Sequence, residues 1–219
     1  MTGTTPLPPR RQPTAAGAVL YGAAGFTVVS LAAYSVWAFG GGWFRGRGGG
    51  PGLYAAIAAG VLALGGGGVH PLLRGERRLA RFYGAFLPAF LAYAVVWSGF
   101  WFWLKFGAGE WLGALFGCAA FVALSAWRLG GWGAFWPALA VFFVLHTAGY
   151  FAGGWSMGEL MTQARAEAAG SPERARLAAL AKLSWGFFHG LGFGAGLGFV
   201  YHALPARGGR PSSVPDPAG

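Results

Sequence analysis

Long runs of hydrophobic residues, separated by short polar or charged segments, make up most of the chain. Each run is about 20 residues long, which is the length an α-helix needs to cross a hydrocarbon core about 30 Å thick. We therefore predict an all-α, polytopic membrane helix bundle of about six transmembrane helices. The predicted spans are residues 15–39, 51–70, 82–104, 111–127, 132–152 and 183–204, with an outer helical hairpin at residues 156–182 between the last two.

Capping signals in the segment between the fifth and sixth spans predict this hairpin. Ser156 and Glu159 have the spacing of a capping box at the start of a short helix, and Gly170 is a suitable stop. Ser171 predicts the cap of a second helix, with Pro172 at its first position, which we expect to run into the sixth span. The hairpin is either a plain connector or a lid or docking element.

The two ends of the chain differ from the spans. Residues 1–14 are polar and Pro-rich, and the apolar run after them is too long for a cleavable signal peptide. Residues 205–219 are rich in Gly, Pro and Ser. We therefore expect a disordered cytoplasmic N-terminus, one transmembrane bundle over residues 15–204, and a disordered tail.

Composition supports the membrane class. The 219 residues are 55% hydrophobic and only 10% charged, which lies outside the range of soluble globular proteins. The net charge of +10 resides between the apolar runs, where basic side chains face lipid headgroups. We expect the lipid bilayer as partner, together with other membrane subunits, and no nucleic acid. The single cysteine, Cys118, lies in an apolar run and is interpreted as a packing residue.

The distribution of basic residues predicts a multi-pass cell-membrane protein with both termini cytoplasmic. Nine basic residues then lie inside, against three in the short outer loops. The inner set is Arg10, Arg11, Arg74, Arg77, Arg78, Arg81, Arg128, Arg207 and Arg210, and the outer set is Arg45, Arg47 and Lys105. Four more in the hairpin oppose this orientation, namely Arg165, Arg174, Arg176 and Lys182.

Four histidines are the main ionisable groups of the spans. The absence of carboxylates there argues against a proton-driven carrier or a cation pump of the usual kind. From their positions along alternating spans, His146 and His189 should share one height in the outer half of the membrane. By the same reasoning, His70 and His202 should share the inner boundary. Ionisable groups inside a membrane are candidate functional residues.

Glycines recur at every fourth position of the sixth span. This spacing lets another helix, or a flat cofactor, approach the backbone closely. The series is Gly186, Gly190, Gly194 and Gly198.

Together, the histidine and glycine positions resemble the plan of membrane b-type cytochromes. His189 and His202 are thirteen residues apart on one helix, a rise of about 19.5 Å. The resemblance implies haem b held by His146 with His189, and by His70 with His202. It also implies that the porphyrin lies against Gly186, Gly190 and Gly194.

Two further stretches carry partial resemblances. Residues 187–193, FFHGLGF, are similar to the HG-x-GF stretch of nickel-permease-like proteins, which implies a metal relay of His70, His146 and His189, although the acidic partner of that family is absent. His189, Gly192 and Gly196 resemble the last core helix of rhomboid intramembrane proteases. The fourth span lacks the G-x-S-G serine of active rhomboids, so this likeness implies a catalytically inactive relative.

The sequence alone leaves several functions open. The leading hypothesis is a non-enzymatic subunit or scaffold of a membrane complex, without catalytic residues. The alternatives are a b-type haem-binding redox subunit, a small-solute or metal-ion permease, and an inactive rhomboid-like protein.

Overall fold

In the computed structural model, residues 13–45, 49–73, 77–105 and 107–204 are described, and within them the chain is helical without any strand. The predicted all-α membrane bundle is thereby confirmed. Its elements are α1 (Ala15–Arg45), α2 (Gly49–Val69), η1 (His70–Leu72), α3 (Arg78–Leu104), α4 (Ala108–Leu129), η2 (Trp132–Ala134), α5 (Phe135–Ala166) and α6 (Pro172–Ala203).

Some sequence predictions fall on residues outside the described ranges. Residues 1–12 and 205–219, which hold nearly all of the two predicted disordered ends, are among them. So are six of the basic residues in the orientation argument, namely Arg10, Arg11, Arg47, Arg74, Arg207 and Arg210.

Five of the described helices are long and apolar enough to cross a membrane. Their apolar stretches are Ala15–Phe44, Ala55–Leu72, Arg78–Leu104, Ala108–Leu129 and Trp132–Ala166. The remaining long helix, α6, is less hydrophobic because its membrane-length part is rich in glycine and carries two histidines. It nevertheless packs extensively against α1 and α5, so it belongs to the same bundle.

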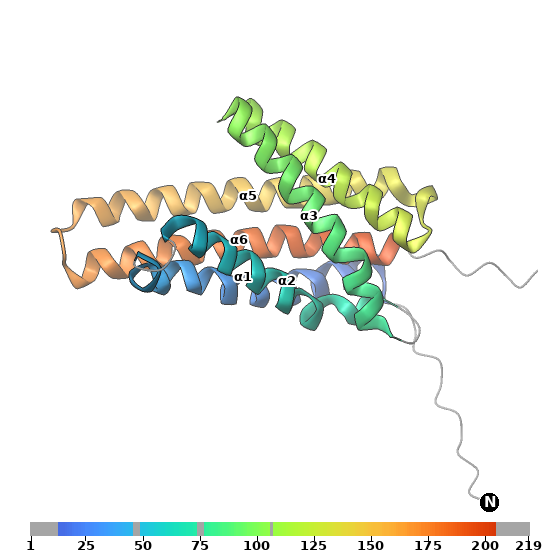
Figure 1. The fold of residues 1–219 in the computed structure, drawn as a ribbon, viewed down its shortest axis with the longest axis horizontal. Helices are drawn as coiled ribbons and strands as arrows, with labels where there is room; N and C mark the ends of the chain where they lie inside the picture. The colour runs from blue at the N-terminus through green and yellow to red at the C-terminus, as the bar shows by residue number, and fades with distance from the viewer. Residues whose placement is uncertain (1–12, 46–48, 74–76, 106, 205–219) are drawn as a thin grey trace, which may run out of the picture.

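The helices run up and down between two ends of the molecule (Figure 1). The start of α1, the α4–α5 turn and the end of α6 meet at one end, where Ala15, Gly131 and Leu204 line a common cavity. We call this the terminal end, and the opposite end, which carries the α5–α6 connection, the hairpin end. The α3–α4 pair is inclined to α1, α5 and α6, and its tip diverges from them toward the hairpin end (Figure 1).

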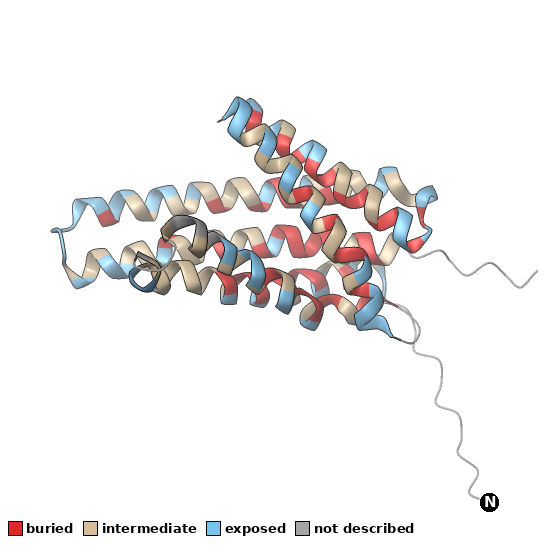
Figure 2. Cartoon of the chain, in the orientation of Figure 1, coloured by how far each residue is buried: buried red, intermediate tan, exposed pale blue. Residues whose placement is uncertain are grey.

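Buried residues concentrate in the middle of the bundle and toward the terminal end, while the hairpin end is mostly exposed (Figure 2). Phe193 of α6 is fully buried at the centre of the core. Its ring contacts Phe26 of α1, Phe90 of α3, Phe121 of α4 and Phe142 of α5. One aromatic side chain therefore joins five helices. The lone Cys118 is buried in the same core.

The connection between α5 and α6 differs in one respect from the prediction. Helix α5 is continuous from Phe135 to Ala166, so no helix begins at Ser156 and the predicted capping box is wrong. The apolar run before Ser156 continues the helix without a break, and a capping pattern inside a helix has no free backbone N–H groups to satisfy. The turn itself includes Gly170 with φ +82°.

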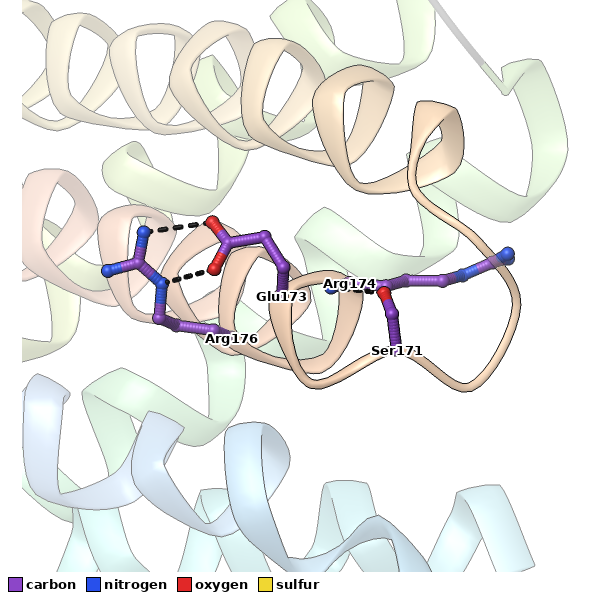
Figure 3. Close-up of polar contacts among 4 residues, drawn as sticks. All are labelled: Ser171, Glu173, Arg174 and Arg176. Carbon is purple, nitrogen blue, oxygen red and sulfur yellow. Dashed lines mark hydrogen bonds and ion pairs between the residues drawn. The ribbon is translucent and has the colours of Figure 1, made fainter.

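The start of α6 agrees with the prediction. Ser171 caps the helix by accepting a hydrogen bond from the Arg174 backbone N–H at 3.2 Å, with Pro172 following (Figure 3). One turn on, Arg176 donates two hydrogen bonds to the Glu173 carboxylate at 2.9 and 3.0 Å. These bonds lower the pKa of the exposed Glu173 carboxyl below its ordinary value. Helix α6 then continues without interruption to Ala203.

Candidate functional site

The structure brings two of the four predicted site histidines together. The rings of His146 on α5 and His189 on α6 have centroids 5.8 Å apart, with planes at 81°. His146 is fully buried, and its Nε2 shares a hydrogen bond of 2.9 Å with the Tyr93 hydroxyl on α3. Phe193 contacts both imidazole rings at 5.6 Å. The candidate site is thus built from α3, α5 and α6.

The other two histidines lie apart from this pair and have separate surroundings. His70 follows α2, and its Nδ1 bonds the backbone carbonyl of Gly66 one turn earlier at 2.5 Å. His202 lines the cavity at the terminal end, beside Gly131 and Leu204. Among the described residues, no hydrogen bond or ring contact joins His70 to His202. Within the described chain, no three side chains of the His, Cys, Asp and Glu type come together as metal ligands.

The glycine face of α6 is covered by α1. A Cβ atom added at Gly186 would lie 2.8 Å from Tyr34 Cβ, and one at Gly190 would lie 2.7 Å from Ser30 Cβ. At Gly194 the nearest side-chain atom, Phe26 Cβ, would be 2.6 Å away. Protein atoms therefore occupy the space beside these three glycines.

Haem between His146 and His189 does not fit this arrangement. Phe193 packs against both imidazole rings, and the ring centroid of Phe142 lies 6.0 Å from that of His146. A porphyrin would have to displace these rings and break the bond between His146 and Tyr93. The glycine face offers no alternative place, because α1 covers it.

A pocket of about 740 Å³ lies beside the histidine pair, where α3 diverges from α1 and α6 toward the hairpin end. Aromatic side chains from four helices form most of its wall. We call it the aromatic pocket; its lining is Tyr34, Trp37, Tyr93, Trp97, Ser98, Trp101, Phe102, Tyr150, Trp185 and His189. The pocket is partly open, and Phe102, one of its lining residues, is 71% exposed on the surface of the bundle.

Polar groups are few in this pocket, and all but the Ser98 hydroxyl come from its aromatic residues. Tyr93 holds His146 behind it, and Tyr150 donates a hydrogen bond of 3.0 Å to Glu110 at the start of α4. The Nε1–H of Trp97 and the Nδ1 of His189 are buried and have no hydrogen-bond partner among the described residues. A buried polar group without a partner costs about 1–3 kcal/mol.

Lys182 of α6 contacts Trp37 of α1, which lines the pocket. The Lys182 ammonium donates a hydrogen bond of 3.3 Å to the Trp37 carbonyl and lies 5.7 Å from the centre of the Trp37 ring. This contact ties the charged part of α6 to the last turns of α1. On α6, Lys182 lies between the charged first turns and the aromatic residues that follow.

Sequence reasoning missed Tyr93, Trp97, Tyr150 and Glu110. One signal was present, because Tyr93, Trp97 and Trp101 are spaced four residues apart and so lie on one face of α3. Their planar side chains indicated membrane anchoring equally well. Only the fold, in which Tyr93 of α3 shares a hydrogen bond with His146 of α5, shows that this face lies against His146.

Comparisons with known proteins do not identify this chain. No family, curated protein or solved structure matches it. The resemblances to b-type cytochromes, nickel permeases and rhomboids therefore rest on the residues quoted above alone.

Proposed function

We propose that this chain is a non-enzymatic subunit of a membrane complex, and that it holds a small, uncharged amphiphile in the aromatic pocket. The observation that carries the proposal is the pocket itself, with a volume of about 740 Å³ and a wall of aromatic side chains. Sites for small molecules have volumes of about 300–1,000 Å³ and combine an apolar wall with a few polar groups.

The lining favours a neutral ligand. It includes no Asp, Glu, Lys or Arg, so an ionic ligand would lose its hydration without gaining a charged partner. Tyrosine and tryptophan offer an apolar ring with one polar atom, which suits a molecule that is itself partly apolar. Because the pocket is partly open and its lining residue Phe102 is exposed on the bundle surface, we propose that a ligand dissolved in the membrane enters beside Phe102.

The proposal includes an orientation in the cell membrane with both termini cytoplasmic. It is supported by Arg77, Arg78, Arg81 and Arg128, which lie at the terminal end. The aromatic pocket would then lie in the outer half of the bilayer. Helix α6 would hold the bundle together through its glycine contacts with α1 and α5.

Equilibrium dialysis of purified protein in a fixed amount of dodecyl maltoside tests ligand binding. The two probes are 2-naphthol, which is neutral at pH 7, and 2-naphthalenesulfonate, which has a similar ring but carries a charge. Micelles without protein give the background. We expect saturable binding of 2-naphthol and none of the sulfonate, because the pocket offers no cationic partner.

Two matched variants locate the binding. Ser98 lines the pocket, so Ser98→Trp should fill it and abolish saturable binding. Gly99 is the next residue, and a Cβ there would meet no atom within 4 Å, so Gly99→Trp adds the same side chain outside the pocket and should leave binding intact. Equal binding by the two variants, or no saturable binding by the natural chain, would refute the proposed function.

A further inference from the structure

We infer that the ligand of the aromatic pocket is a flat ring whose two oxygens are carbonyls in one form and hydroxyls in the other, that is, a quinone and its quinol. The inference rests on the proposed function of the pocket and adds the chemical class of the ligand. It is carried by the hydrogen bond between Tyr93 and His146, together with the unpartnered polar atoms beside it.

The Tyr93–His146 pair can present either a donor or an acceptor to the pocket. If Nε2 of His146 carries the proton, it donates to the Tyr93 oxygen, and the Tyr93 O–H is free to donate to a carbonyl. If Nε2 is unprotonated, the Tyr93 O–H donates to it, and the Tyr93 oxygen can accept from a hydroxyl. The imidazole is neutral in both cases. Only its tautomer changes.

The surroundings of His146 allow this exchange. Its Nδ1 is buried and has no hydrogen-bond partner among the described residues, so no neighbour fixes which nitrogen carries the proton. The groups that face the ring are Tyr93, Phe142, Tyr150, His189 and Phe193, none of them acidic. A ligand oxygen at Tyr93 would therefore determine the tautomer.

A second unpartnered polar atom lies one turn along α3. The Nε1–H of Trp97 is buried without an acceptor, and Trp97 lies four residues after Tyr93, a rise of about 6 Å. The ring centroids of Trp97 and Trp101 lie 6.2 Å apart and the ring planes are only 13° from parallel, so the two rings form a flat wall for a ligand ring.

Three probes with the same carbon skeleton test the inference on the natural chain. They are 2,3-dimethyl-1,4-naphthoquinone, its 1,4-dihydroxy form kept reduced under argon, and 2,3-dimethylnaphthalene, which has no oxygen. The methyl groups block addition of the cysteine thiol. We expect the dione and the diol each to bind about 2- to 10-fold more tightly than the hydrocarbon, as the hydrogen bond requires.

Variants of Tyr93 separate hydrogen bonding from shape. Tyr93→Phe should remove most of the preference for the dione and the diol while leaving hydrocarbon binding unchanged. Tyr83→Phe, on the same helix, is the control, because Tyr83 bonds the backbone at Ala63 and Gly66 and does not line the pocket. The control should keep both preferences.

His146 is inferred to act as a positioning residue through Tyr93. In His146→Phe, the Tyr93 O–H loses its acceptor but can still donate to a carbonyl, so the diol should weaken several-fold relative to the dione. His146→Gln offers both an acceptor and a donor, so it should restore the ratio. A merely structural role would weaken the two probes equally.

The outcomes distinguish this inference from the proposed function. If none of the three probes binds the natural chain saturably, the pocket function itself fails. If the hydrocarbon binds as tightly as the dione and the diol, the pocket binds ligands but the quinone assignment is overturned. An unchanged dione-to-diol ratio in His146→Phe, with hydrocarbon binding intact, overturns the role of the Tyr93–His146 pair.

Discussion

At Gly149, α5 and α6 approach closely enough for one added methyl group to test their packing. A Cβ at Gly149 would lie 2.5 Å from the Phe188 carbonyl oxygen and 2.8 Å from Gly192 Cα. Ordinary contacts begin at 3.4 Å, so the added methyl group would have to move away from the Phe188 carbonyl oxygen by about 0.9 Å and from Gly192 Cα by about 0.6 Å. Gly154, five residues later on α5, would meet nothing within 4 Å and provides a matched control.

The two alanine variants isolate the cost of this separation. Replacing glycine by alanine inside a helix gains about 0.5–1 kcal/mol from backbone entropy, and both variants receive this gain. Only Gly149→Ala adds the cost of overpacking, typically about 1–3 kcal/mol. Lipid supplies no hydrophobic drive to push the helices back together. We therefore expect Gly149→Ala to be less stable than Gly154→Ala by about 1–3 kcal/mol.

Equilibrium unfolding measures this difference. Dodecyl sulfate is titrated into protein in dodecyl maltoside micelles, and loss of structure is followed by tryptophan fluorescence. The Gly149→Ala midpoint should fall below that of the natural chain, while the Gly154→Ala midpoint should stay level or rise. Equal midpoints for the two variants would show that the close approach of α5 and α6 does not restrict side-chain size, and the packing argument would be wrong.

Three further predictions concern the hairpin and the core. Ser171→Ala should cost about 0.5–2 kcal/mol of local stability by removing the cap of α6, visible as faster amide hydrogen exchange in residues 173–176, whereas Ser156→Ala, inside α5, should leave the exchange of residues 173–176 unchanged. Arg176→Gln should raise the pKa of Glu173, as followed by carboxyl carbon NMR. Because the folded-state pKa is lowered, the pair stabilises the chain above the ordinary glutamate pKa and loses this effect as pH falls through the lowered value; an unmoved titration would exclude the hydrogen bonds as its cause. Cys118 is buried, so N-ethylmaleimide should label it only as dodecyl sulfate unfolds the bundle, and rapid labelling of folded protein would contradict its position in the core.

The sequence was most informative about the helices and least about their rotations and tilts. The membrane-length apolar runs predicted the bundle because a polar backbone in lipid must satisfy its hydrogen bonds within a helix. The cap at Ser171 was also readable, since it depends on neighbours in sequence. Ser156 carried an equally good local pattern, but the continuous α5 overrides it. Local signals could not distinguish the two cases.

The site required information that no single helix contains. The contact between Tyr93 and His146 depends on how α3 is rotated about its axis and where it crosses α5. The aromatic pocket depends on the inclination of the α3–α4 pair, which packing between distant segments sets. Glu110 lies at the start of α4, and only the fold shows that it accepts a hydrogen bond from Tyr150.

The lengths of α5 and α6 have a consequence for how the protein sits in a bilayer. From Lys182 to Ala203, α6 rises about 32 Å, which matches a hydrocarbon thickness of about 30 Å. The ten residues before Lys182 add about 15 Å, so the α5–α6 tip stands clear of the acyl chains as a stiff post in water. A membrane a few ångströms thicker would cover part of that post without tilting the helices. An antibody would reach a short epitope inserted after Glu167 on unbroken cells only if the α5–α6 tip faces outward.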